Sequence, residues 1–345
     1  MEKLRVGIVG AGNIARSCHM PAYRKIEDVE VVAVADINYE RAQQMAAQFN
    51  IPKAFASIEE MLAGAEMDFV DICVWNGSHA PCAIAAARAG KAILCEKPMA
   101  ASLEQALEMQ KEIEKAGVPF MLAVCTRYSP QVQLLKQMIT EGKLGDIYYA
   151  KTAYTRRRGT PKGWFTDTRK SGGGPVIDLG VHCIDRSWYL MGNPTPVRVS
   201  ASTSYAIGNY QTKGVSRWCA LDSDMTAFDT EDSACGLIKF DNGASLMFEV
   251  SWAMNAPGES YTQILGSKGG ARFDPLMIYG EESGYLTDNA PQTGNQDIFE
   301  EEIRHFVHCL RTGEKPISDL NQAVTMQRIL DAIYKSASLG KEVEI

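Results

Sequence analysis

The sequence lacks the features that mark nucleic-acid-binding, membrane and secreted proteins. Its 35 basic residues are outnumbered by 42 acidic ones, and the formal net charge of -7 leaves no basic footprint for nucleic acid. No uninterrupted apolar stretch approaches the roughly 18 residues of a membrane-spanning helix, and the first residues show no secretory signal pattern. We therefore expect a soluble, cytoplasmic protein that binds neither nucleic acid nor membranes.

Disulfides and cysteine-rich metal clusters are also poorly supported. The cysteines are odd in number, scattered, and form no Cys-x-x-Cys pair, which favours reduced thiols, mostly in the core. His305, His308 and Cys309 share one face of a predicted helix, but no further ligand set accompanies them, so we predict no metal site. The nine cysteines are Cys18, Cys73, Cys82, Cys95, Cys125, Cys183, Cys219, Cys235 and Cys309.

What is present is enough chain for two domains, since 345 residues exceed one ordinary core. Residues 1–125 alternate apolar strand-length runs with helical patterns, which predicts an α/β domain with a doubly wound parallel sheet, a Rossmann domain. The expected strands cover residues 4–9, 29–35, 69–74, 92–95 and 120–124. The expected helices cover residues 14–26, 39–49, 58–63, 80–89 and 103–116.

Residues 126–345 have a different texture, with longer strands that alternate polar and apolar residues. The segments 234–240 and 244–252 flank an Asp-Asn-Gly turn and predict a hairpin. Two helices, at 297–311 and 321–339, close the chain. We expect a substrate-binding and oligomerisation domain with an open, mostly antiparallel sheet, whose C-terminal helix could pack back on the first domain.

A glycine-rich loop follows the first predicted strand and reads Gly10-Ala11-Gly12-Asn13-Ile14-Ala15. Gly10 permits a tight turn, Gly12 lets a pyrophosphate approach the backbone, and the helix N-terminus favours phosphate. Asp36 ends the next strand, where a carboxylate would accept hydrogen bonds from ribose hydroxyls and repel a 2′-phosphate. The pattern favours NAD over NADP, although Arg41 lies one turn further on. The alternative is a glycine turn and a capping aspartate without a ligand.

A second motif, Glu96-Lys97-Pro98, stands at the carboxyl end of the strand at 92–95. Doubly wound sheets bind their ligands at this edge. Pro98 restrains Lys97 from helical conformation. Two interpretations remain open from the residues alone: an ammonium that contacts a ligand, or a structural Glu96–Lys97 ion pair at the rim of the sheet.

A third motif places Asp178 and His182 on an apolar helix that spans 175–190, after Gly172-Gly173-Gly174. Residues four apart lie on one helix face. A carboxylate beside an imidazole would orient the ring and raise its pKa, as a general base requires. The alternative is a core histidine that is satisfied by its neighbour.

Together, the three motifs resemble those of the glucose-fructose oxidoreductase, inositol dehydrogenase and MocA family of NAD(P)-dependent oxidoreductases, over essentially the whole chain. The resemblance implies that Lys97 hydrogen-bonds the reacting oxygen and that His182 accepts the hydroxyl proton. It implies that Asp178 holds the imidazole or contacts the sugar, while hydride passes to nicotinamide. It also implies a sugar, polyol or glycoside substrate and a homodimer or homotetramer.

One segment departs from the family pattern, which commonly has Thr-Pro after the fourth strand. Here the run is Val74-Trp75-Asn76-Gly77-Ser78-His79, in which His79 fits and Trp75-Asn76 does not. These residues are expected beside the nicotinamide ribose, although Trp75 could be a packing residue. The expected cofactor set is Gly10, Gly12, Asn13, Ile14, Asp36, Trp75, Asn76, His79, Glu96 and Lys97.

The substrate side is less well defined. Side-chain alternation along 147–158 puts Tyr154, Arg156 and Arg158 on one face, with Trp164 and Phe165 just downstream. This segment could present cations and an aromatic platform to a sugar, or it could be a strand with solvated arginines. The expected substrate set is Lys97, Arg156, Arg158, Trp164, Asp178 and His182.

Three functions are compatible with these motifs. The first is an NAD-dependent dehydrogenase that oxidises a secondary hydroxyl of a sugar, inositol or glycoside. The second is a redox-cycling enzyme that keeps NAD bound and oxidises a sugar transiently. The third is a non-catalytic sugar or dinucleotide sensor, against which the presence of Lys97, Asp178 and His182 argues.

Overall fold

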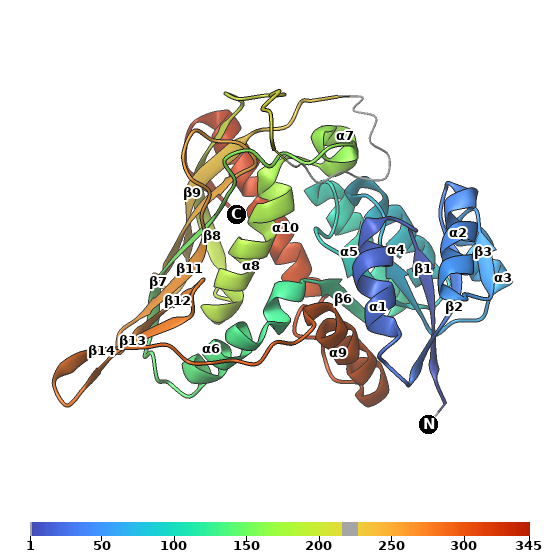
Figure 1. Ribbon diagram of the computed structural model, residues 1–345, viewed down its shortest axis with the longest axis horizontal. Coiled ribbons are helices and arrows are strands. Elements are labelled where there is room, and N and C mark those ends of the chain that lie inside the picture. Colours follow the sequence, from blue (N-terminus) through green and yellow to red (C-terminus); the bar gives the residue numbers. More distant parts are fainter. Residues whose placement is uncertain (1, 216–226) are drawn as a thin grey trace.

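The first part of the chain folds into a parallel six-stranded sheet (Figure 1). The computed structural model describes residues 2–215 and 227–345. The strand order β3-β2-β1-β4-β5-β6 is that of a Rossmann fold, with its topological switch point between β1 and β4. The strands are β1 (Leu4–Val9), β2 (Val29–Ala35), β3 (Lys53–Phe55), β4 (Phe69–Ile72), β5 (Ala92–Glu96) and β6 (Phe120–Ala123).

The helices between these strands cover both faces of the sheet, as the apolar strand pattern predicts. Asn38, Ser57 and Ser102 cap three of them by accepting a backbone N–H three residues on. The helices are α2 (Tyr39–Phe49), α3 (Ile58–Gly64), α4 (His79–Arg88) and α5 (Leu103–Ala116), with a 3₁₀ turn η2 (Asn76–Ser78) before α4.

Two elements of the Rossmann half differ in detail from the prediction. The short edge strand β3 was not expected, because three partly exposed residues carry too little pattern. The helix predicted at 14–26 is present over residues 13–23, but its middle, η1 (Ala15–His19), is π-helical, and the short α1 (Met20–Tyr23) follows it. A π-helix has a wider turn than an α-helix and is frequent at functional sites.

The second sheet has nine strands in the order β14-β13-β12-β11-β7-β10-β9-β8-β15. All its neighbours pair antiparallel except β7 and β10, and the predicted hairpin is β9–β10. The strands are β7 (Ile147–Thr155), β8 (Pro196–Ser204), β9 (Ser233–Phe240), β10 (Ser245–Ser251), β11 (Ser260–Gly266), β12 (Gly270–Phe273), β13 (Met277–Glu282), β14 (Tyr285–Asn289) and β15 (Val343–Glu344).

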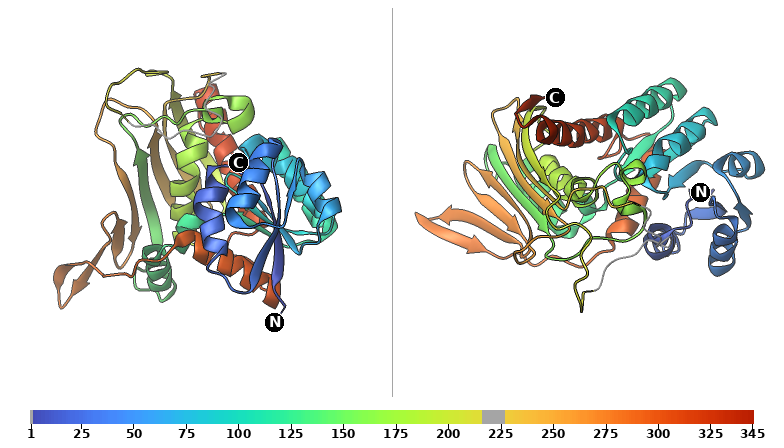
Figure 2. Two further views of the ribbon diagram at one scale, coloured as in Figure 1. Left: turned by 45° about the vertical axis from the view of Figure 1, so that its right-hand side comes forward. Right: turned by 90° about the horizontal axis from the view of Figure 1, so that it is seen from above.

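One face of this sheet is covered by helices, and the other face is open (Figure 2). Figures 1 and 2 place α8 against the sheet and α10 between the sheet and the Rossmann half. The covering elements are α6 (Pro130–Thr140), the π-helical turn η5 (Val176–Gly180), α8 (Val181–Leu190) and α10 (Leu320–Leu339). Shorter turns are η3 (Cys125–Tyr128), η4 (Trp164–Thr166) and α7 (Thr168–Ser171).

Both C-terminal helices also contact the Rossmann half. Ile303, Phe306 and Val307 of α9 (Ile298–Thr312) share a hydrophobic cluster with β1. Ala323 and Val324 of α10 join the cluster on the opposite face of the same sheet. The last part of the chain therefore packs against the first sheet through two helices.

Cysteine burial is mixed. Five of the eight described cysteines are buried, whereas Cys235 is exposed, and all eight are free thiols. Cys219 lies outside the described residues. Within residues 2–215 and 227–345, no helix is long and apolar enough to cross a membrane.

Candidate active site

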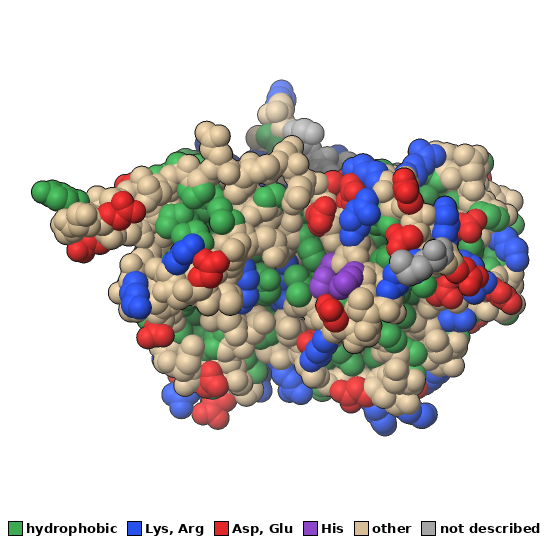
Figure 3. Space-filling model, turned by 90° about the horizontal axis from the view of Figure 1, so that it is seen from below, with side chains coloured by type: hydrophobic (Ala, Val, Ile, Leu, Met, Phe, Trp, Pro, Cys, Tyr) green, Lys and Arg blue, Asp and Glu red, His purple; other side chains and the backbone are tan. Residues whose placement is uncertain are grey.

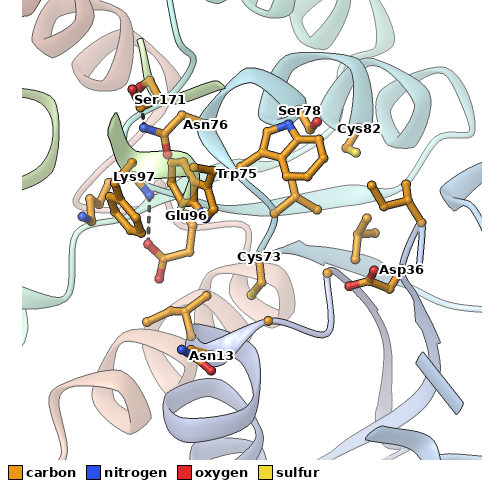
Figure 4. Close-up of a pocket in the computed structure, with 18 of the residues that line it drawn as sticks. Asn13, Asp36, Cys73, Trp75, Asn76, Ser78, Cys82, Glu96, Lys97 and Ser171 are labelled. Carbon is orange, nitrogen blue, oxygen red and sulfur yellow. Dashed lines mark hydrogen bonds between the residues drawn. The ribbon is translucent and has the colours of Figure 1, made fainter. Parts of the chain in front are cut away.

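A cavity of about 590 Å³ opens at the carboxyl ends of β1, β4 and β5, against η5 and the loop after β7 (Figure 4). It runs from Asp36, beside the glycine loop, to Lys97 and Asp178. The two short motifs of the Rossmann half thus line one continuous cavity with the third motif of the second half.

The glycine loop forms the turn that its sequence predicts. Gly10 has φ +98°, a left-handed conformation that favours glycine, and a Cβ there would collide with the Cys73 carbonyl. Asp36 is nearly buried, and its carboxylate accepts hydrogen bonds of 2.8 Å from the backbone N–H groups of Ala11 and Asn38. The loop, the carboxylate and the following η1 helix therefore form one fixed unit at the cavity wall.

Lys97 follows β5 and bridges the two halves of the molecule. Its Nζ donates to the Asp178 carbonyl oxygen at 3.3 Å and lies 3.5 Å from Asp178 Oδ1. The Lys97 backbone N–H donates to Glu96 Oε2 at 3.1 Å, one of the contacts dashed in Figure 4. The sequence left two interpretations, a ligand-facing ammonium or a Glu96–Lys97 ion pair; the ammonium contacts Asp178 and lines the cavity.

Asp178 and His182 are not paired as we expected. The Asp178 side chain accepts a 2.9 Å hydrogen bond from Trp252 Nε1 and faces Lys97, while His182 Nδ1 is buried and has no partner among the described residues. Asp178 lies in the π-helical turn η5, and Trp252, just after β10, competes for its carboxylate. A hydrogen bond between distant parts of the chain has replaced the predicted local one.

The direction of the pKa shift that we expected for His182 is also wrong. Burial lowers the pKa of His182 well below its ordinary value, and the positive charges of Lys97, Arg186 and Arg156 lower it further. We expected Asp178 to raise this pKa. The direction of this shift favours a neutral imidazole at neutral pH. The His182 side chain does not line the cavity.

The residues after β4 link the two halves. Asn76 donates from Nδ2 to the Ser171 carbonyl oxygen at 2.7 Å, and Trp75 lines the cavity with the Lys170 ammonium 5.5 Å from its ring. His79 lies behind the cavity wall, with Nδ1 2.7 Å from the Pro98 carbonyl oxygen. Burial lowers the pKa of His79. His79 thus holds the segment after β5 in place and does not line the cavity.

The two arginines of the predicted substrate face diverge. Arg156 lines the cavity and donates to the Gly159 carbonyl oxygen and the Tyr154 hydroxyl. Arg158 is directed at the backbone carbonyls of Arg157 and Met254 and does not line it.

Trp164 and Phe165 line the cavity too, as stacked rings with centroids 3.9 Å apart. Of the sequence-predicted site residues, the cavity brings together Gly10, Gly12, Asn13, Ile14, Asp36, Trp75, Asn76, Glu96, Lys97, Arg156, Trp164 and Asp178, and leaves out His79, Arg158 and His182.

Two positioning residues escaped the sequence analysis. Trp252 holds Asp178, and nothing in the local pattern distinguishes it from a core tryptophan. Glu231 accepts the N–H groups of Gly174 and Val176 and the Tyr334 hydroxyl, and so fixes the start of η5. A Cβ on Gly174 would come within 2.6 Å of the Glu231 carbonyl oxygen, which explains glycine at that position.

One group of metal-ligand type lies near the cavity, formed by the buried His19, Asp71 and Cys73. Both ring nitrogens of His19 are already engaged by carboxylates, at 2.7 Å from Asp71 and 3.0 Å from Glu96. The residues form a hydrogen-bonded cluster. In α9, His305 Nε2 accepts the Ile317 N–H, so one nitrogen of the His305, His308 and Cys309 group has a backbone partner.

A Rossmann sheet whose ligand-binding edge faces a lysine–aspartate pair defines an α/β oxidoreductase with a dinucleotide site. Residues 4–124 match the oxidoreductase family with an NAD-binding Rossmann fold, and residues 136–345 match the C-terminal α/β domain of that family. The chain therefore belongs to the glucose-fructose oxidoreductase, inositol dehydrogenase and MocA family.

Similar proteins include the D-glucoside 3-dehydrogenase of Escherichia coli K12, 33% identical over 353 residues that cover 99% of this chain and 97% of that protein. The D-xylose 1-dehydrogenase (NADP(+)) 2 of Haloferax volcanii is 30% identical over 98% of this chain and 99% of its own length. A solved structure of levoglucosan dehydrogenase with NADH and L-sorbose is 24% identical, covers 100% of this chain and 99% of its own, and has a TM-score of 0.87. This last likeness confirms the fold.

Proposed function

We propose that this protein is an NAD-dependent dehydrogenase that oxidises a secondary hydroxyl of a sugar, inositol or glycoside. The observation that carries the proposal is the continuity of one cavity from the Asp36 end of the glycine loop to the Lys97–Asp178 pair. Membership of an oxidoreductase family and the 33% identity to a D-glucoside 3-dehydrogenase support the same substrate class.

The dinucleotide would be held by the glycine loop, Asp36 and the residues after β4. The fit rests on the left-handed turn at Gly10, on Gly12, which lines the cavity without a side chain, and on Asp36, which lines it too. Each Asp36 oxygen accepts one backbone N–H and retains a lone pair for a ribose hydroxyl. When bound, nicotinamide supplies the hydride acceptor.

We propose NAD over NADP because a carboxylate at this position repels a 2′-phosphate, although Arg41 also lines the cavity. An Asp36→Ser variant should bind NAD more weakly and lose its preference against NADP. Fluorescence titration with NADH and NADPH measures both, and an unchanged preference would refute the assignment.

Lys97 would donate a hydrogen bond to the reacting hydroxyl oxygen and stabilise the alkoxide that forms there. Asp178 keeps the ammonium in place through its carbonyl and carboxylate oxygens, and Trp252 keeps Asp178 in place. This arrangement gives Asp178 a positioning role toward Lys97, in addition to any contact with a sugar hydroxyl.

His182 would accept the hydroxyl proton. A general base must be unprotonated before the reaction, and the lowered pKa of His182 keeps it so at neutral pH. Its buried Nδ1 has no partner among the described residues.

The substrate wall would be formed by Arg156 and by the stacked rings of Trp164 and Phe165. Flat aromatic rings suit the apolar face of a sugar ring, and the free N–H groups of Arg156 suit its hydroxyls.

We further propose that residues 1–125 act as the cofactor domain and residues 126–345 as the substrate and oligomerisation domain. Tyr148, Met247 and Tyr279 are exposed on strands of the open sheet or beside them. In the view from below, hydrophobic side chains gather on the half of the molecule that carries this sheet (Figure 3). Such a face suits a homodimer or homotetramer. Sedimentation velocity of the wild type and of a Met247→Glu variant would test this assembly.

The decisive experiment screens purified protein and NAD against sugars, inositols and glycosides, with absorbance of NADH as the readout and acid-released cofactor measured on the same sample. Steady NADH production supports a dissociating dehydrogenase. Stoichiometric NAD released by acid, without NADH accumulation, supports the redox-cycling alternative. Absence of any bound or bindable NAD refutes both.

A matched pair of variants tests the site itself. Lys97→Met should abolish turnover, whereas Lys91→Met, at the other end of β5, should not. An active Lys97→Met enzyme would overturn the assignment of Lys97. A wild-type protein that bound NAD and oxidised no sugar would revive the sensor alternative.

A further inference from the structure

A cluster of buried titratable side chains lies behind the cavity wall and takes no part in the steps above. His19 is fully buried, with Nδ1 2.7 Å from Asp71 Oδ2 and Nε2 3.0 Å from Glu96 Oε1. The Tyr23 hydroxyl donates to Asp71 Oδ2 at 3.0 Å, and Cys73 Sγ lies 3.5 Å from His19 Nδ1. The imidazole is thus clamped between two carboxylates from β4 and β5.

The charges of these groups are mutually dependent. Burial opposes a charged imidazole, but the Asp71 carboxylate raises the pKa of His19 well above its ordinary value. Burial opposes ionisation of Glu96 too, but the His19 hydrogen bond and charge lower its pKa. From α9, Glu302 faces the same cluster, and burial together with Glu96 raises its pKa, so it is held neutral. These directions favour an imidazolium at His19, hydrogen-bonded to Asp71 and Glu96.

One end of this cluster reaches the catalytic lysine. Glu96 uses Oε1 for His19 and Oε2 for the backbone N–H of Lys97, so its two oxygens connect the buried imidazole to the segment that carries the ammonium. Glu96 also lines the cavity, whereas His19 does not. The wide π-helical turn of η1 ends at His19 and delivers its ring to this position.

We propose that His19 is a positioning residue for Lys97: its ring holds the Glu96 carboxylate in the orientation that anchors the Lys97 backbone. The inference rests on the proposed function, because it concerns the lysine assigned there. Without the His19 bond, Glu96 is free to rotate toward the Lys97 ammonium, which would compete with Asp178 and displace the ammonium. Small displacements of a reacting group reduce rates by up to about 100-fold.

Two conservative variants separate this role from simple packing. The amide nitrogen of asparagine falls near Nδ1 of histidine, so His19→Asn retains a donor to Asp71 and loses the one to Glu96. The amide of glutamine falls near Nε2, so His19→Gln retains the donor to Glu96. We expect His19→Asn to lower kcat about tenfold or more with the sugar KM changed less than about threefold, and His19→Gln to retain most of kcat.

His305→Asn is the matched control, since His305 lies on α9 with its Nε2 on the Ile317 N–H and outside the cavity. It should leave kcat unchanged. Thermal unfolding and NADH binding of each variant show whether it is folded. Equal losses of kcat in His19→Asn and His19→Gln, in proportion to lost stability, would overturn the proposal in favour of a structural role, as would unchanged kcat in both.

A second readout needs no substrate. Acetic anhydride acetylates the unprotonated amine of a lysine. Mass spectrometry compares the extent of labelling of Lys97 with that of the other lysines of the same molecule. A Glu96 carboxylate turned toward the ammonium should slow labelling of Lys97 in His19→Asn and not in His19→Gln. If no sugar is oxidised while Lys97 labelling responds in this way, the proposed function fails and the positioning role stands. If sugars are oxidised and neither readout distinguishes the variants, the positioning role fails alone.

Discussion

Two histidines, the buried His19 and the half-buried His182, have surroundings that are opposite in charge. His19 is held by Asp71 and Glu96, and its pKa is raised; His182 stands among Lys97, Arg186 and Arg156, and its pKa is lowered. The same side chain is thus a charged clamp in the Rossmann half and a neutral ring in the second half. Environment, and not residue type, assigns an imidazole to structure or to proton transfer.

The same contrast appears in hydrogen bonding. Both nitrogens of His19 are satisfied by carboxylates, whereas His182 retains an unpaired Nδ1 among the described residues. A satisfied, charged imidazole cannot accept a proton, and an unpaired neutral one can. In the proposed mechanism, the second half of the molecule therefore supplies the proton acceptor.

Removing the neutral ring should give the largest effect. His182→Gln removes the proposed proton acceptor and should lower kcat by about 10²–10⁴-fold, the usual contribution of a general base. His308→Gln, on an exposed face of α9, should not change kcat. Steady-state kinetics with the identified sugar measure both. A His182→Gln enzyme whose kcat lies within threefold of the wild-type value would show that His182 is not the proton acceptor.

The support of Asp178 can be tested by a pair of tryptophan variants. Trp252→Phe removes the N–H that holds Asp178 Oδ2 and should lower kcat about tenfold, as expected for one hydrogen bond to a charged group. Trp188→Phe removes an equivalent buried indole N–H, which donates to the Pro194 carbonyl oxygen away from the cavity. It should cost stability without lowering kcat. Similar kcat values for the two variants would show that the hydrogen bond from Trp252 to Asp178 does not support the function of Lys97.

The opposite pKa shifts predict opposite pH dependences of stability. The folded-state pKa of His182 lies below the unfolded value of 6.5, so protonation favours unfolding and the wild type should lose stability as pH falls below about 6.5 more steeply than His182→Gln.

The folded-state pKa of His19 is raised, so its contribution is fully present below the unfolded value of 6.5 and is lost as pH rises through the folded pKa. The stability difference between wild type and His19→Gln should be greatest at acidic pH. Urea unfolding from pH 5 to 9 measures both variants, and parallel curves would contradict the opposite charges.

Glu302 offers the smallest expected effect. It is fully buried, both carboxylate oxygens lack partners among the described residues, and its pKa is raised well above the usual range. Its stability contribution is lost as pH rises above the unfolded value, so Glu302→Gln should be neutral at low pH and slightly stabilising at high pH. Glu301→Gln, its neighbour on α9, should show no such trend. A destabilised Glu302→Gln at pH 9 would require a bound counter-charge.

Much of the fold was predictable because it depends on local pattern. Apolar runs predicted five Rossmann strands, and the Asp-Asn-Gly turn predicted the β9–β10 hairpin. The edge strand β3 and the two π-helical turns were not predicted, since one is too short to carry a pattern and the others depend on packing. The C-terminal α9 and α10 were predicted as helices, and their docking on the first sheet required the structure.

The sequence by itself determined the glycine turn, the strand-end lysine and the helix that bears Asp178 and His182, because each motif is written in neighbouring residues. Only the tertiary structure decided which groups their side chains contact. Trp252 takes the Asp178 carboxylate, burial and three cations lower the pKa of His182, and Asp71 of β4 raises the pKa of His19. Hydrogen-bond partners and pKa values depend on groups that are distant in sequence, so local pattern cannot specify them.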